Sequence, residues 1–111
     1  MKVIKDSEGE KYDAKQHFGC WTAYKLQAGK DTKRLNVSTT HFLPEGGAEM
    51  SSSPRERVYV LLSGAMKVTG KNEEHFLEPG DMIYIAPGEE RAVQVIGNEP
   101  ATTLVIVATI E

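Results

Sequence analysis

The sequence predicts an all-β fold, in which a single domain forms an antiparallel sandwich or barrel. Three observations support this prediction. Short apolar runs recur along the chain, separated by clusters of Gly, Pro, Asn and acidic residues. Few windows show the apolar repeat of three or four residues that marks an amphipathic helix. The length of 111 residues suits one domain with one substantial core.

Each apolar run ends at a turn signal, so the runs define seven or eight short strands at regular spacing. The sequence PEGG closes the second run, Gly64 closes the third, and GKNE separates two runs that together suggest a hairpin. Later runs end at PGEE and GNEP. The expected strands are residues 17–26, 34–43, 57–63, 65–69, 74–77, 82–86, 91–96 and 102–110.

Composition excludes several functional classes. A net charge of −3 argues against nucleic acid as a partner. No stretch approaches the roughly 20 apolar residues of a membrane helix, and the N-terminus lacks the apolar run of a signal peptide. Cys20 is the single cysteine, so no intrachain disulfide can form, and we expect a buried structural thiol rather than a nucleophile. These features favour a cytoplasmic protein without a membrane partner.

Two spaced motifs make the sequence more specific. Arg57 lies seven residues before Gly64, downstream of the stretch PEGGAE. Gly80 is followed by Ala86-Pro87-Gly88 and then, three residues later, by Arg91. This spacing resembles the two motifs of the cupin superfamily, which are small jelly-roll barrels. The resemblance implies a single cupin domain over residues 1–111, with its barrel core at 34–111.

The metal-ligand positions of the family are replaced in this chain. Ser51 and Ser53 stand at the places of the His-x-His pair, Arg57 at that of the glutamate, and Arg91 at that of the last histidine. Cupin metals are held by neutral imidazoles and a carboxylate. Serine hydroxyls are poor ligands, and arginine offers N–H donors but no acceptor. We therefore expect no metal at the usual site and no cofactor.

A shift of register does not restore a metal site. A slip of one residue would turn Glu56 inward, but it would also reverse the other side chains of that strand and supply no histidine. His17 and His75 lie away from the motifs. His41 lies near the start of the first motif, and we keep it as a candidate ligand-binding residue. The alternative is a hydrogen-bonded or surface histidine.

Alternation along the strands predicts what the barrel encloses. If Arg57 points inward, Tyr59 points inward too, because alternate residues share a face. The expected ligand-binding residues are Ser51, Ser53, Arg57, Arg91 and His41. Paired guanidinium groups suit a small organic anion. The alternative is that Arg57 pairs internally with a carboxylate and needs no ligand; Glu49, Glu56 and Asp81 are the candidates.

Three functions are compatible with such a pocket. The first is a metal-independent enzyme of the isomerase, lyase or decarboxylase type. Tyr59 would then be the catalytic proton donor and the arginines would stabilise negative charge. The second is a non-catalytic binding or accessory module for the same kind of ligand. The third, ranked last, is a metal-dependent cupin with an unusual site that uses His41.

Residues 1–33 form a candidate N-terminal arm before the barrel motifs. The stretch FGCWTAYKL is apolar, and similar small cupins pair through sheet edges and N-terminal strands. We therefore expect a homodimer with Trp21 and Tyr24 as anchors. The alternative is that Trp21 packs over its own barrel.

Overall fold

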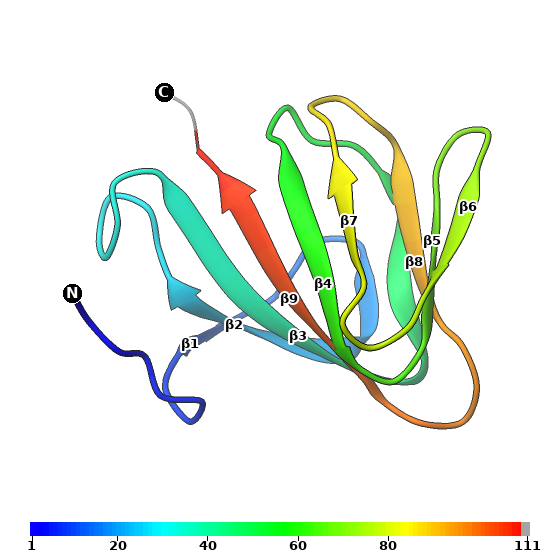
Figure 1. The fold of residues 1–111 in the computed structure, drawn as a ribbon, viewed down its shortest axis with the longest axis horizontal. Coiled ribbons are helices and arrows are strands. Elements are labelled where there is room, and N and C mark those ends of the chain that lie inside the picture. The colour runs from blue at the N-terminus through cyan, green and yellow to red at the C-terminus, as the bar shows by residue number, and fades with distance from the viewer. Residues whose placement is uncertain (110–111) are drawn as a thin grey trace.

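A computed structural model describes residues 1–109 and confirms an all-β fold (Figure 1). Across those residues, the structure contains no helix with the length and hydrophobicity needed to cross a membrane. The strands are β1 (Glu10–Tyr12), β2 (His17–Leu26), β3 (Leu35–Ser51), β4 (Arg57–Ser63), β5 (Met66–Thr69), β6 (Glu74–Leu77), β7 (Met82–Ile85), β8 (Arg91–Val95) and β9 (Ala101–Ala108).

Most of the predicted strands are present with bounds that differ by at most a residue. The short strand β1 was not predicted, and residue 110 of the last predicted strand lies outside the described residues. The turn predicted at PEGG is wrong, because β3 runs through it to Ser51. The strand bends there instead, where Glu45 takes the left-handed region with a φ of 70°.

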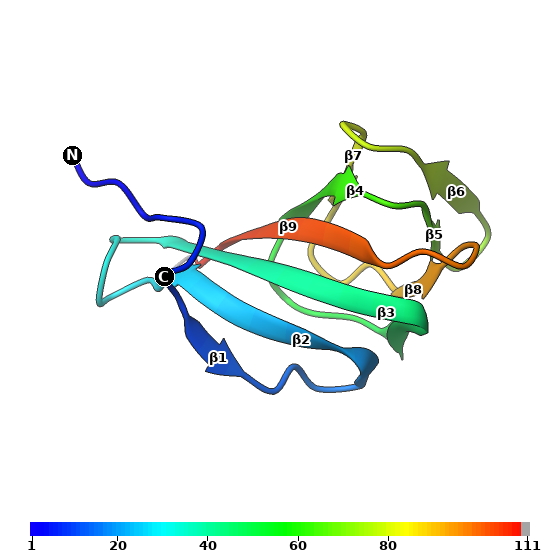
Figure 2. The ribbon, with the colours of Figure 1, turned by 90° about the horizontal axis from the view of Figure 1, so that it is seen from below.

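Strand β3 organises the sheet. Along one edge it pairs with β2, which in turn pairs with β1. Along the other edge it pairs first with β9, up to Phe42, and then with β8, from Gly47 onward. The other seven strands follow the order β6-β5-β8-β3-β9-β4-β7, with β2 and β1 off this path, and all strand pairs are antiparallel. The change of partner along β3 lets one sheet curl round into a barrel, as Figure 2 shows.

The change of partner requires glycine at two positions. A Cβ at Gly46 would lie 2.4 Å from the carbonyl oxygen of Gly19 in β2. A Cβ at Gly47 would lie 2.2 Å from the carbonyl oxygen of Val93 in β8. Neither space can hold a side chain, so the backbone of β3 lies directly against both neighbours at the bend.

Apolar side chains fill one part of the barrel interior. The core contains Phe42, Tyr59, Leu61, Met66, Val68, Leu77, Ile85, Val93, Val95 and Ala101. The alternation expected along β4 and β8 is therefore present. Polar side chains are also buried inside the barrel, among them Ser38, Thr40, Thr103 and Arg91. Burying hydroxyls and a guanidinium is costly without partners, which directs attention to the space that they surround.

We expect Gly47→Ala to lower the free energy of unfolding by about 1–3 kcal/mol, as overpacking usually does. The carbonyl of Val93 cannot move away without disturbing the β3–β8 ladder. Gly70→Ala is the control, because its new Cβ would approach the flexible side chain of Glu73, at 3.1 Å. Urea unfolding followed by circular dichroism measures both variants. Equal stability of the two would contradict the close approach at Gly47.

Candidate functional site

The barrel contains a cavity of about 590 Å³ between its strands. Inward side chains of β3, β4, β8 and β9 form its walls. The β1–β2 loop at residues 13–16 and the β3–β4 loop at residues 52–55 also line it. The volume falls within the range of sites for small organic molecules, roughly 300–1,000 Å³.

The lining of this cavity is positively charged, although the chain as a whole carries −3. Among the described residues, four basic side chains line it, Lys15, Arg55, Arg57 and Arg91, against one acidic side chain, Asp13. A concave site with low-dielectric walls concentrates such a field and draws in ions of opposite sign. The electrostatics therefore favour an anion and oppose a cation.

Arg91 is held in place by three hydrogen bonds. Its Nε donates to the hydroxyl of Tyr59 at 3.1 Å. Its Nη1 donates to the backbone oxygen of Ser51 at 3.0 Å and to the Oγ of Ser51 at 3.4 Å. Ser51 and Arg91 face each other in the β3–β8 ladder, so the strand register itself positions this contact. Arg91 thereby links β8 to both β3 and β4.

Arg57 has fewer hydrogen-bond partners than Arg91. Its Nε is buried and has no hydrogen-bond partner among residues 1–109. Burial lowers the pKa of its guanidinium; Tyr59 opposes that shift, and the charge of Arg91 adds to it. Arginine nevertheless remains a cation at neutral pH. The result is a positively charged side chain that lines the cavity and has one buried N–H donor unsatisfied by residues 1–109.

The alternative, an internal ion pair of Arg57, is not seen in the described part of the chain, where no carboxylate lies within 4.0 Å of either arginine. Two of the candidate partners have other roles. The carboxylate of Glu56 accepts a hydrogen bond from the Tyr84 hydroxyl at 2.7 Å. The carboxylate of Asp81 accepts one from the backbone N–H of Glu78 at 2.9 Å. Glu49 is exposed.

Tyr59 lies between the two arginines and is 7% exposed. Its hydroxyl oxygen accepts the hydrogen bond from Arg91, which leaves its own O–H free to donate. Within residues 1–109 the Tyr59 hydroxyl accepts this hydrogen bond and is not seen to donate one. The phenol is therefore oriented by the protein yet has a proton available to the cavity.

The two serines at the replaced motif positions both line the cavity, but they also support the backbone. Ser51 holds Arg91, as described above. The Oγ of Ser53 accepts a hydrogen bond from the backbone N–H of Arg55 at 3.2 Å, and the Ser53 carbonyl accepts one from Gly88 at 2.7 Å. The second contact ties the β3–β4 loop to the loop that precedes β8.

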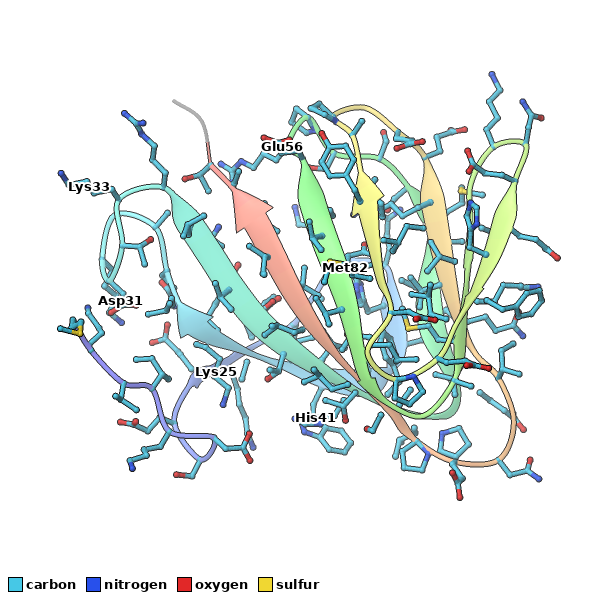
Figure 3. The ribbon with its side chains drawn as sticks, in the orientation of Figure 1. Lys25, Asp31, Lys33, His41, Glu56 and Met82 are labelled. Atoms are coloured by element: carbon cyan, nitrogen blue, oxygen red, sulfur yellow. The ribbon has the colours of Figure 1, made fainter. Side chains whose placement is uncertain are left out.

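His41 lies on the outer face of the sheet and does not line this cavity. Alternation explains the correction: Thr40 and Phe42 point inward, so the residue between them points outward. Its ring stacks on Trp21 at 5.4 Å, and its Nδ1 lies 3.1 Å from the Oγ1 of Thr102. Figure 3 shows His41 at one end of the sheet and Glu56 at the other. We leave His41 out of the candidate site.

The two expected dimer anchors occupy different faces. Trp21 is half exposed on the outer face, where Met82 and Tyr84 are exposed too. Tyr24 instead lines the cavity and stacks on Tyr12, with ring centroids 4.0 Å apart. Tyr24 therefore cannot anchor a contact on the outer face in this conformation. The homodimer stays a prediction.

Several polar residues of the cavity were missed in the sequence. The Tyr12 hydroxyl donates to the Oγ of Ser38 at 3.3 Å, and burial raises the pKa of Tyr12. Asn36, Ser38 and Thr40 alternate along β3 and line the cavity. This run of polar residues on the inward face was the available signal. No sequence signal identified Tyr12, because a strand of three residues is too short to show a periodic pattern.

The residues present do not fit the metal that the fold family often carries. In the described chain, no group of three or more His, Cys, Asp or Glu side chains could hold a metal ion. The positions of the motif hold two hydroxyls and two guanidinium groups, which supply almost no electron-pair donors and two positive charges. No chemical step is therefore assigned to a metal at this site.

The antiparallel barrel, in which β3 pairs with β8 and β9 from the far end of the chain, is compatible with a jelly roll. A family model described as a cupin domain matches residues 38–107, which is more than half of the chain. The chain belongs to the cupin domain family. It is also similar to the Beta-D-galactosidase Rv1717 of Mycobacterium tuberculosis, with 34% identity over 111 aligned residues. That alignment covers 97% of this chain and 94% of the relative.

Solved structures share this fold at low sequence identity. One is the polyketide cyclase RemF from Streptomyces resistomycificus, with a TM-score of 0.85 and 15% identity, covering 99% of this chain and 80% of that one. Another is a predicted oxalate decarboxylase from Thermotoga maritima, with a TM-score of 0.83 and 16% identity, covering 98% and 100%. At such identities the likeness establishes the fold alone.

We expect the two buried arginines to differ in their effect on stability. Arg91→Met should lower the free energy of unfolding by about 2–3 kcal/mol, because it removes hydrogen bonds from a charged donor. Arg57→Met should leave that free energy unchanged or raise it by about 1 kcal/mol, because an apolar side chain replaces a buried, poorly partnered charge. Urea unfolding measures both. A loss for Arg57→Met as large as that for Arg91→Met would show that Arg57 is partnered in solution.

Proposed function

We propose that the cavity binds a small organic anion through Arg57 and acts without a metal ion. The single observation that carries this proposal is the buried Nε of Arg57, which has no partner among the described residues. A buried charged donor without a partner costs free energy, and a bound carboxylate would recover it. The basic lining of the cavity supports the same conclusion.

Guanidinium geometry supports a carboxylate as the bound group. The Nε and one Nη of arginine form a planar pair of donors that matches the two oxygens of a carboxylate. Arg91 already donates through its Nε and Nη1 to Tyr59 and Ser51. In this proposal Arg57 is therefore the residue that contacts the anion. Arg91 holds Tyr59 in position and adds positive charge.

Acid–base chemistry is the reaction type that this arrangement supports. The O–H of Tyr59 could donate a proton to a ligand carbon or oxygen that gains negative charge. The Nε–H of Arg91, at 3.1 Å, would then stabilise the phenolate left behind. An isomerase, lyase or decarboxylase would use such a step. A binding or accessory protein would use the same contacts without it.

We expect small carboxylates to raise the melting temperature of the protein and Arg57→Met to weaken their binding about 10- to 100-fold, the value of a charge-assisted hydrogen bond. The readouts are thermal shift and titration calorimetry with carboxylates of two to six carbons. A chelator should leave the shift unchanged, because no metal takes part in the proposed site.

Arg34→Met is the matched control, because Arg34 is exposed and does not line the cavity. It removes the same charge from the chain and should bind like the wild type. If no carboxylate stabilises the protein, or if both variants weaken binding equally, the anion site is wrong. Turnover that depends on Tyr59→Phe would favour an enzyme over a binding protein.

Glycoside hydrolysis is a second candidate, favoured by the relative named as a beta-D-galactosidase. Most glycosidases use two carboxylates, whereas Asp13 is the one acidic side chain that lines this cavity among residues 1–109. In such a reaction Asp13 would act as the acid or base. Tyr59 would have to take the second role, as tyrosine does in some glycosidases.

This second candidate predicts that the protein releases nitrophenol from p-nitrophenyl β-D-galactoside. Asp13→Asn should then reduce the rate by at least about 100-fold, as expected for loss of a general acid or base. Asp6→Asn is the control, because Asp6 is exposed and lies outside the cavity lining. Absence of release above the buffer rate, or equal rates for the two variants, would reject the candidate.

A further inference from the structure

We propose that the anion held in this cavity is a polyhydroxylated carboxylate, such as a hexuronate or an aldonate; this inference rests on the anion site proposed above. The argument comes from the part of the cavity wall that β3 and β9 form beside the arginines. This wall contains polar side chains, although the interior of a barrel can be entirely apolar. It presents an amide and several hydroxyls, and each points into the same cavity as Arg57.

Strand register places the two sets of polar groups relative to each other. Asn36 in β3 pairs with Val107 in β9, which pairs with Arg57 in β4. One row further along, Ser38 pairs with Val105, which pairs with Tyr59. The hydroxyl wall on β3 is therefore two strand spacings from the arginine and the phenol on β4. With neighbouring strands 4.7–4.9 Å apart, that is roughly 10 Å along the sheet.

The third row continues the pattern. Thr40 in β3 pairs directly with Thr103 in β9. Both residues are buried, both line the cavity, and neither hydroxyl has a hydrogen-bond partner among residues 1–109. Asn36 uses its Oδ1 to accept from the backbone N–H of Ala28 at 2.8 Å, which leaves its amide N–H groups free. The wall thus offers donors and acceptors that the protein does not itself use.

These unused groups discriminate between classes of anion. An apolar acid would displace water from Thr40, Thr103 and Asn36 without replacing its hydrogen bonds, which is unfavourable. A very small anion, such as a two-carbon diacid, would leave most of the 590 Å³ empty or filled with water. A molecule with a carboxylate at one end and several hydroxyls along its length can form hydrogen bonds both with Arg57 and with the hydroxyl wall. Val105 and Val107 between the walls would contact its C–H groups.

Calorimetric titration with matched ligands tests the inference. The panel contains galacturonate, glucuronate, gluconate and galactonate; cyclohexanecarboxylate, which keeps a carboxylate and a six-membered ring without hydroxyls; and galactose and glucose, which lack the carboxylate. We expect at least one sugar acid to bind tenfold or more tightly than cyclohexanecarboxylate. The neutral sugars should bind more weakly than that acid by a similar factor.

Two neighbouring variants distinguish the loss of a ligand contact at the hydroxyl wall from a general effect on stability. Thr40→Val should weaken the best sugar acid at least fivefold and leave cyclohexanecarboxylate unchanged. Thr39→Val is its control, because Thr39 is the adjacent buried residue of the same strand and does not line the cavity. If Thr39→Val weakens binding as much as Thr40→Val, the effect is structural and the inference fails.

The outcomes distinguish a failure of this inference from a failure of the anion-site proposal on which it rests. If cyclohexanecarboxylate binds as tightly as every sugar acid and Arg57→Met weakens it, the polyhydroxylated ligand is wrong and the anion site stands. If no acid of either kind binds, both are wrong. If the neutral sugars bind as tightly as the acids, the role of Arg57 as the anion contact is wrong.

Discussion

The hydrogen bonds of Arg91 are the interaction on which the rest of the site depends. Through them a side chain of β8 reaches Ser51 on the neighbouring strand β3 and Tyr59 on β4, a strand that does not pair with β8. The barrel interior therefore contains a polar crosslink where an apolar side chain would otherwise pack. Arg57, by contrast, has a buried Nε without a hydrogen-bond partner among the described residues. In our proposal, stability and ligand binding are therefore divided between two residues of the same type.

A cation site and an anion site can occupy the same barrel because the strands determine position rather than chemistry. The inward places on β3, β4 and β8 are set by alternation and register. Imidazoles and a carboxylate at those places would face a shared point and attract a metal. In our proposal, the hydroxyls and guanidinium groups at the same places attract the opposite charge. The fold therefore determines where a ligand can bind. The four side chains at the motif positions determine whether the site prefers a positive or a negative ligand.

Much of the fold could be predicted from the sequence because strand periodicity and turn residues are local signals. The inward direction of Arg57, Tyr59 and Arg91 followed from the same alternation. The bend of β3 could not be predicted, since PEGG has the composition of a turn and only the pairing with β8 shows that the strand continues. His41 was misplaced because proximity to a motif says nothing about the face on which a residue lies. The partner of Arg91 depended on contacts across the barrel, which no local pattern reveals.

The central position of β3 has a consequence for how the protein is made. Its first half pairs with the last strand, so that Leu35 lies opposite Ala108 and Phe42 opposite Ala101. These contacts join residues separated by most of the chain, and contacts of that kind form slowly because a long loop must close first. During synthesis the barrel cannot close until β9 has emerged from the ribosome. Until then the apolar side chains of the core, among them Phe42, Leu61 and Val68, are exposed, and exposed apolar surface makes an incomplete chain prone to aggregation.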